Sequence, residues 1–197
     1  MQHRTRQLLD AAGRGDAAGV RTALDAGAPV EARDEELRSP LLLASLGGHV
    51  EAAQVLLAAG ADPDAQDARR DSAWLVTGVT GDVAMMRVLL TAGPDLTLRN
   101  RFGGIALIPA SERGHVAYVR AVLRDTGMDV DHVNDLGWTA LLEAVILGDG
   151  GRPHQEVVRL LLAAGARPDL PDAEGVTALR HAERRGFDAI AALLRAA

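Results

Sequence analysis

Histidines and carboxylates are the side chains in this sequence that could transfer protons or bind a metal. Glu143 and His181 hold equivalent positions in two similar segments, so the fold could bring them, with His154 and Asp149, close to one glycine-rich stretch. If the fold gathers them, they could form a small-ligand, metal or catalytic site. Their spacing matches no ligand signature, such as two histidines one helical turn apart, and a solvated polar surface is the simpler interpretation. This site is therefore the alternative hypothesis for function.

Composition excludes several other chemistries. The chain has no cysteine, which excludes disulfides, thiolate nucleophiles and cysteine-held zinc or iron–sulfur sites. All 21 Lys or Arg residues are arginine, so a Schiff-base lysine and a P-loop lysine are also absent. None of the serines lies in a nucleophile-elbow sequence. The stretch from Gly148 to Pro153 could be an anion nest, but no strand precedes it, which favours a surface loop.

The charge balance argues against nucleic acid as a partner. The 27 acidic residues outnumber the 21 basic ones and give a net charge of −6, whereas nucleic-acid-binding proteins usually present a basic surface. The start of the chain has no apolar run of signal-peptide length, and apolar stretches such as 55–61 are too short to span a membrane. We expect a cytoplasmic protein with no cofactor, no nucleic-acid partner and no membrane partner.

The chain repeats itself with a period of about 33 residues. One set of glycines recurs at spacings of 33, 33, 33, 34 and 38 residues, and an apolar track keeps the same spacing. The glycines are Gly15, Gly48, Gly81, Gly114, Gly148 and Gly186. The apolar track consists of Leu8, Leu41, Trp74, Leu107, Leu141 and Leu179. This agreement predicts an array of similar structural units.

Each unit is predicted to form two short helices. In the second unit, Ser39 is suited to cap a helix whose first residue is Pro40. Gly47 and Gly48 would end this helix, because glycine adopts the left-handed conformation without a steric penalty. A second helix over 49–59 would follow, with its apolar residues on one face, and then a polar connection rich in turn-forming residues.

Two short motifs recur in these units. An opening of serine or threonine, then proline or alanine, then leucine occurs at 39–41, 139–141 and 177–179, and glycine followed by histidine occurs at 48–49 and 114–115. They resemble the opening and the joint of the ankyrin repeat. The resemblance implies an all-α ankyrin-repeat solenoid of about six helix-turn-helix units with short β-hairpin-like turns. We expect one domain over 1–197, with units at about 1–33, 34–66, 67–99, 100–133, 134–171 and 172–197.

The third and fourth units depart from this pattern. Arg70 occupies the position of a turn glycine, and Trp74 replaces a leucine of the apolar track, where we expect it to fill the core. Pro109 lies inside the first helix of the fourth unit, which it should weaken or kink. Insertions near residue 126 and around 149–153 should form loops. His49 and His115, which follow the joint glycines, are expected to make structural hydrogen bonds.

The resemblance further implies a non-enzymatic protein that binds another protein on a concave surface of turn tips and first helices. Phe102 and Trp138 lie at tips of adjacent units, where water is the expected neighbour, and aromatic side chains beside arginine are typical of binding hot spots. They could instead pack on each other or against the helices. The predicted partner-binding residues are Arg69, Arg101, Phe102, Glu112, Arg113 and Trp138.

Overall fold

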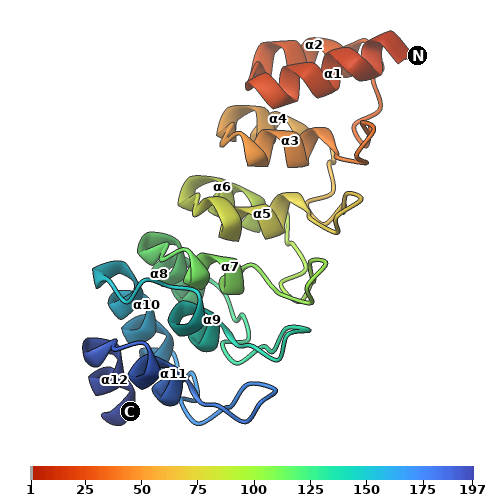
Figure 1. The fold of residues 1–197 in the computed structure, drawn as a ribbon. Helices are drawn as coiled ribbons and strands as arrows, with labels where there is room; N and C mark the ends of the chain where they lie inside the picture. The colour runs from red at the N-terminus through yellow and green to blue at the C-terminus, as the bar shows by residue number, and fades with distance from the viewer. Residues whose placement is uncertain (1) are drawn as a thin grey trace. The chain divides into compact units, whose positions relative to one another are not determined.

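The computed structural model describes residues 2–197, with side chains from His3 onwards. In this part of the chain twelve α-helices follow one another in pairs, and a loop precedes the first helix of each later pair (Figure 1). The pairs are α1 (Gln2–Arg14) and α2 (Ala17–Asp25), α3 (Pro40–Leu46) and α4 (Val50–Ala58), α5 (Ala73–Thr80) and α6 (Val83–Leu90), α7 (Leu107–Glu112) and α8 (Val116–Asp125), α9 (Ala140–Ile146) and α10 (Arg152–Ala163), and α11 (Ala178–Arg184) and α12 (Asp188–Arg195).

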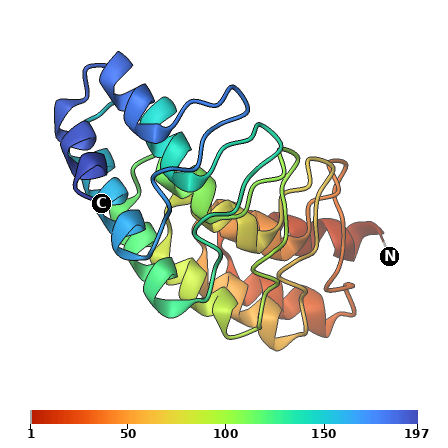
Figure 2. The same cartoon turned by 90° about the horizontal axis from the view of Figure 1, so that it is seen from below.

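The chain forms two compact units, Met1–Arg101 and Phe102–Ala197. In the first unit α1 packs on α3 and α3 on α5, while α2 packs on α4 and α4 on α6. In the second unit the first helices α7, α9 and α11 are stacked in the same order, and so are the second helices α8, α10 and α12. In each unit the loops project away from their own helices (Figure 2). Because a single pair cannot bury its apolar face, stacking of neighbouring pairs supplies the core.

Five of the six residues of the predicted apolar track lie in this core, and the sixth, Leu179, is only half-buried. Leu8, Leu41, Trp74 and Leu107 are fully buried at 0% exposure, and Leu141 is nearly so. Alanines fill much of the remaining space between helices, since aromatic residues are scarce. The prediction that Trp74 is a core residue is confirmed. The predicted single domain over 1–197 remains a prediction.

Serine and threonine caps begin the first helices, as the opening motif predicts. The hydroxyl oxygen of Ser39 accepts the backbone N–H of Leu42 at 3.1 Å, and Thr139 caps α9 in the same way. The equivalent residue before α7 is Ile105, and α7 has no side-chain cap. Pro109 does not interrupt α7, because it lies in the first turn, where its missing N–H has no helical acceptor to lose. The observed departure is a late start that leaves α7 with six residues.

The loops are turns rather than extended hairpins. Within the described residues, one isolated antiparallel bridge, Pro171 to Thr177, represents the expected β-hairpin character. In each of four loops, the side-chain oxygen of the residue that begins the turn at the tip accepts the backbone N–H groups two and four residues further on. The four residues are Asp34, Asp67, Asn134 and Asp172.

The third residue after the one that begins the turn has a positive φ. Glycine occupies this position at Gly103, Gly137 and Gly175, whereas Leu37 and Arg70 adopt φ of 62° and 61° despite their side chains. A side chain in the left-handed region costs about 1–2 kcal/mol because its Cβ approaches the carbonyl oxygen. Leu37 and Arg70 therefore lower the stability of the first unit.

Replacement of Arg70 by glycine is expected to raise the free energy of unfolding by roughly 0.5–1 kcal/mol, because relief of the Cβ clash exceeds the added flexibility of the unfolded chain. The hydrogen bond from Gln66 Nε2 to the Arg70 carbonyl, at 2.7 Å, uses backbone and is retained. Urea denaturation measures the change. Arg70→Ala is the control: it keeps the Cβ and should show no gain. An equal gain for both variants would attribute the effect to the arginine charge.

Candidate functional site

The loop tips of the second unit carry exposed apolar side chains. Phe102 and Leu136 occupy the same place in successive loops, and each is 49% exposed. The backbone N–H of Asp135 donates to the carbonyl oxygen of Phe102 at 2.9 Å, so the two loops are hydrogen-bonded side by side. Leu136 is as exposed as Phe102, although only Phe102 was predicted from the sequence to bind a partner. Large apolar side chains are seldom exposed together at a loop tip that faces water. These two residues are called the Phe102–Leu136 pair below.

The other residues predicted in the second unit differ in their exposure. Trp138 lies two residues after Leu136 and is half-buried, so part of its side chain packs and the rest is accessible, and its role in binding stays a prediction. At the end of α7, Glu112 is half-buried and Arg113 is exposed. The second unit thus offers aromatic, aliphatic and charged groups at its loop tips and at the ends of its first helices.

The two predicted residues of the first unit are both exposed arginines. Arg69 lies at a loop tip, and the guanidinium of Arg101 is 4.0 Å from the Asp71 carboxylate. Burial and the charge of Asp67 raise the pKa of Asp71, whereas Arg101 and Arg69 act to lower it. Gln66 donates to the carbonyl oxygens of Arg70 and Arg99 at 2.7 and 2.8 Å, which ties adjacent loops together. The arginines therefore extend from a hydrogen-bonded loop layer.

Joint histidines connect two of the helix pairs to the pair before them. His49 Nε2 hydrogen-bonds the Gly13 carbonyl oxygen at 3.1 Å, which confirms its predicted structural role. His154 Nε2 makes the equivalent bond to the Glu112 carbonyl oxygen at 2.8 Å. His154 is therefore the joint histidine of the fifth repeat, displaced by the insertion before it. Aligning the repeats across that insertion would have identified it.

The insertion supplies a hydrogen-bond partner for the second ring nitrogen of His154, Nδ1. Asp149 Oδ1 accepts the Gly151 backbone N–H at 2.8 Å and lies 2.8 Å from His154 Nδ1, and these contacts lower the pKa of Asp149. In the last pair Phe187 replaces the histidine. There, Arg185 lies 4.6 Å over the Phe187 ring and donates to the carbonyl oxygens of Val145 and Ile146. An arginine thus supplies the tie that phenylalanine cannot make.

Glu143 has a strongly raised pKa. It is 6% exposed, and its Oε1 accepts a hydrogen bond from Asn134 Nδ2 at 2.8 Å. Burial and the charge of Glu112 raise the pKa of Glu143 to about 7. Because Asn134 Oδ1 also accepts the N–H groups of Leu136 and Trp138, Glu143 braces the loop that carries them.

The residues of the alternative small-ligand, metal or catalytic site do not come together. Glu143 pairs with Asn134, His154 with Asp149, and His181 Nε2 with Asp172 Oδ2 at 2.6 Å, the second such brace beneath a loop. No group of three or more His, Asp or Glu side chains between residues 2 and 197 could hold a metal ion. Each of the three residues has a separate structural partner, which favours the structural interpretation.

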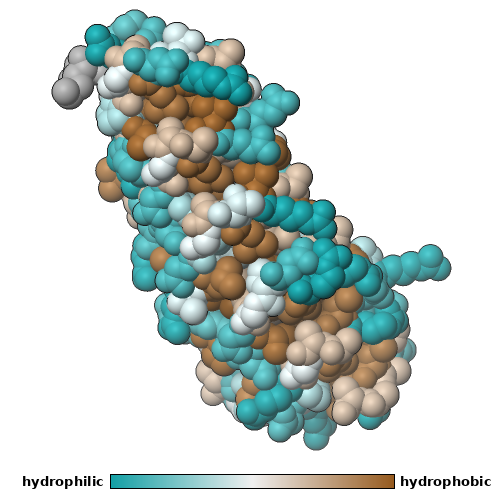
Figure 3. Space-filling view, turned by 180° about the vertical axis from the view of Figure 1, so that it is seen from behind, coloured by the Kyte–Doolittle hydropathy of each residue, from teal (hydrophilic) through white to brown (hydrophobic). Residues whose placement is uncertain are grey.

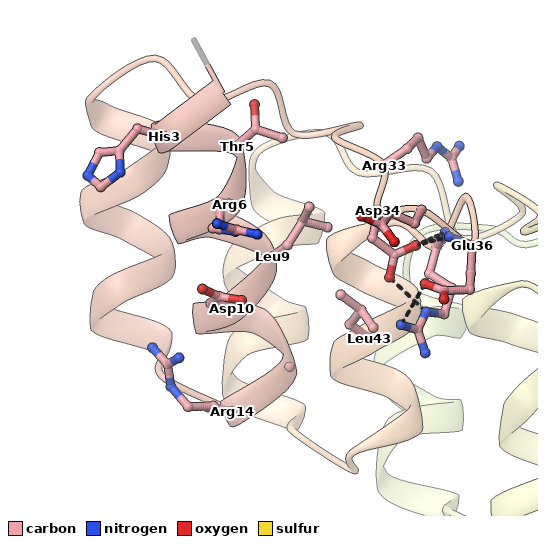
Figure 4. Close-up of a pocket in the computed structure, with 13 residues that line it drawn as sticks. His3, Thr5, Arg6, Leu9, Asp10, Arg14, Arg33, Asp34, Glu36 and Leu43 are labelled. Carbon is pink, nitrogen blue, oxygen red and sulfur yellow. Dashed lines mark hydrogen bonds and ion pairs between the residues drawn. The ribbon is translucent and has the colours of Figure 1, made fainter.

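The first unit contains a hollow that the sequence did not predict. It has a volume of about 1100 Å³ and lies between α1 and the loop before α3. Figure 4 shows Arg6, Asp10 and Arg14 along α1, with the loop across from them and Leu9 and Leu43 between the two walls. Elsewhere, apolar side chains gather in patches bordered by hydrophilic ones on the face seen in Figure 3.

Stacked helix pairs joined by loops and by glycine–histidine joints define a repeat protein of helical hairpins. The model for three ankyrin repeats matches residues 75–172, and the single ankyrin repeat matches residues 36–68. The chain belongs to the ankyrin repeat family, and its fold is the ankyrin-repeat fold. Proteins of this family are generally protein–protein interaction modules and non-enzymatic scaffolds.

Known relatives agree with this assignment. The ankyrin repeat protein YahD of Escherichia coli K12 is 50% identical over 97 residues, which are 49% of this chain and 48% of that protein. The match thus spans about half the length of the curated relative. Among crystal structures, an ankyrin repeat domain from Acinetobacter baumannii AYE is 45% identical with a TM-score of 0.90, over 96% of both chains. The ankyrin repeat domain of Bcl-3, a member of the IκB family, is 26% identical with a TM-score of 0.85, over 96% of this chain and 85% of that one.

A membrane-spanning helix is not found among the described residues. The cytoplasmic location expected from the sequence stays a prediction.

Proposed function

We propose that this chain is a non-enzymatic protein-binding module whose second unit engages a partner protein through its loop tips and the ends of its first helices. Phe102, Leu136 and the accessible part of Trp138 are the anchors, and Glu112 and Arg113 at the end of α7 are further contacts. Arg69 and Arg101 are the corresponding contacts in the first unit. The single observation that carries the proposal is the exposure of the Phe102–Leu136 pair at two adjacent loop tips.

Preorganisation supports this role. The loops that carry the anchors are fixed by backbone hydrogen bonds, by Asn134 and by buried Glu143, so binding requires little ordering of the chain. Exposed aromatic and aliphatic groups that fill a partner's pocket contribute most of the binding free energy at such surfaces. Charged neighbours at the rim set orientation and reject wrong partners.

The test is affinity capture from the native host's lysate, quantified by mass spectrometry, with the whole chain as bait. The double variant Phe102→Ala, Trp138→Ala is expected to lose the specifically captured protein, while its free energy of unfolding falls by only about 1 kcal/mol, or roughly 2–4 °C in Tm. A control double variant, Arg120→Ala with Arg159→Ala, removes two exposed side chains of the second helices and should retain capture. Unchanged capture by the Phe102/Trp138 variant would contradict the proposal.

A further inference from the structure

Helix α1 presents a row of alternating charges to the hollow of the first unit. Arg6, Asp10 and Arg14 follow one another at four-residue intervals, all three are exposed, and all three line the hollow (Figure 4). Within the described residues none of them forms an ion pair, whereas Arg38 on the opposite wall is bound to Asp34 at 2.8 Å and to Glu36 at 3.2 Å. On that wall Glu35 is also without an ion pair among the described residues, so most of the unpaired charges of the hollow lie on α1.

The spacing of this row matches one side of an extended peptide. Four residues of α-helix rise about 6 Å along the axis. Alternate residues of an extended chain point to the same side and are separated by about 6.6 Å. An extended segment that runs along α1 could therefore place an acidic side chain at Arg6, a basic one at Asp10 and an acidic one at Arg14, nearly in register.

We propose that the hollow of the first unit binds an extended protein segment in which acidic, basic and acidic residues alternate with uncharged ones. The segment lies along α1 with its three charges on Arg6, Asp10 and Arg14. Its backbone and uncharged side chains cover Leu9 and Leu43, which are half-buried on the floor. This inference rests on the proposed function only in that the ligand is a protein segment.

The dimensions and charges of the hollow favour this ligand over others. Its volume of about 1100 Å³ exceeds the roughly 300–1,000 Å³ of ordinary small-molecule sites. A nucleic-acid strand would place phosphates against Asp10 and against the acidic loop residues Asp34, Glu35 and Glu36. A peptide with charges of both signs meets complementary groups on α1 instead, and complementarity of this kind sets register and specificity.

The test uses the whole chain and two fluorescein-labelled peptides in anisotropy titrations. In the first peptide Glu, Lys and Glu alternate with Thr and Val; the second has the same composition, with Lys moved to one end. The first peptide is expected to bind about tenfold more tightly at low salt, and this difference should shrink near 0.5 M salt, because exposed ion pairs are screened. Equal affinity for the two peptides would overturn the proposal.

A charge reversal provides a second, independent measurement. The triple variant Arg6→Glu, Asp10→Arg, Arg14→Glu should prefer the inverted peptide in which Lys, Glu and Lys alternate with the same spacers. Arg21→Glu, at an exposed position of α2, is the matched control and should leave the original preference unchanged. Circular dichroism checks that the triple variant is folded, and failure of the preference to invert would also overturn the proposal. Neither experiment involves Phe102 or Trp138, so its outcome is distinguishable from that of the proposed function.

Discussion

Replacement of Trp74 by alanine is expected to lower the free energy of unfolding by about 3–5 kcal/mol, the largest loss expected from a single substitution in this protein. Trp74 is 0% exposed and fills the leucine position of the apolar track in the first unit. Its removal leaves a cavity lined by neighbouring helices, and the surrounding helices can close that cavity only in part. Urea denaturation followed by far-ultraviolet circular dichroism measures the loss.

Two matched variants separate burial from residue type. Trp138→Ala removes the same side chain from a half-buried loop position and should cost no more than about 1 kcal/mol. Trp74→Phe keeps most of the ring and removes the indole N–H, whose nitrogen is buried without a hydrogen-bond partner among the described residues. Because an unpaired buried donor costs about 1–3 kcal/mol, Trp74→Phe should cost far less than Trp74→Ala. A loss for Trp138→Ala equal to that for Trp74→Ala would place Trp138 in the core and remove it from the proposed binding surface.

Replacement of Glu143 by glutamine is expected to raise the free energy of unfolding at pH 8 by about 2–3 kcal/mol, because a tenfold change in proton affinity on folding corresponds to about 1.4 kcal/mol. The pKa of Glu143 is raised from 4.5 to about 7, mainly by burial. The folded protein therefore binds the Glu143 proton more tightly than the unfolded chain. The contribution of Glu143 to stability is greatest below pH 4.5 and is lost as the pH rises through 7. Glutamine is neutral throughout and still accepts the Asn134 hydrogen bond.

Denaturation midpoints of the two proteins between pH 5 and 8.5 provide the measurement. The difference between Glu143→Gln and the unmodified chain should be small near pH 5 and should grow toward pH 8. Glu112→Gln is the control, because it removes the neighbouring charge that raises the pKa of Glu143 but leaves the burial. It should shift the transition to lower pH without abolishing it. A difference that is constant across this range would show that Glu143 does not titrate there.

Much of the fold could be predicted from the sequence, because repetition multiplies weak local signals. Ser39, Pro40 and the paired glycines are weak evidence for one helix. The same order of residue types recurs in later repeats, and this recurrence predicts the helix pairs and their order. The place of Trp74 in the apolar track, rather than its residue type, predicts its burial. The prediction for Pro109 is wrong because the effect of a proline depends on where α7 begins, and the missing cap at Ile105 moves that start.

The candidate site was predicted less completely. Exposure of Phe102 followed from its loop position, whereas the partial burial of Trp138 depends on packing that spacing does not specify. Glu143 and His181 have the residue types of a catalytic pair, but Asn134 and Asp172, each nine residues earlier, engage them. The hollow along α1 depends on the separation of a helix and a loop in space, and no local pattern encodes it.

The five-residue insertion before His154 shows how a joint can be enlarged. Helix α10 begins two residues before this histidine, whereas α4 and α8 begin just after theirs, and yet the bond from His154 to the Glu112 carbonyl oxygen is kept. Length can therefore be added at this joint while the histidine contact is retained. For protein engineering, a segment grafted into this joint would have to leave Gly150 in place, because a Cβ there would lie 2.5 Å from the Phe187 ring.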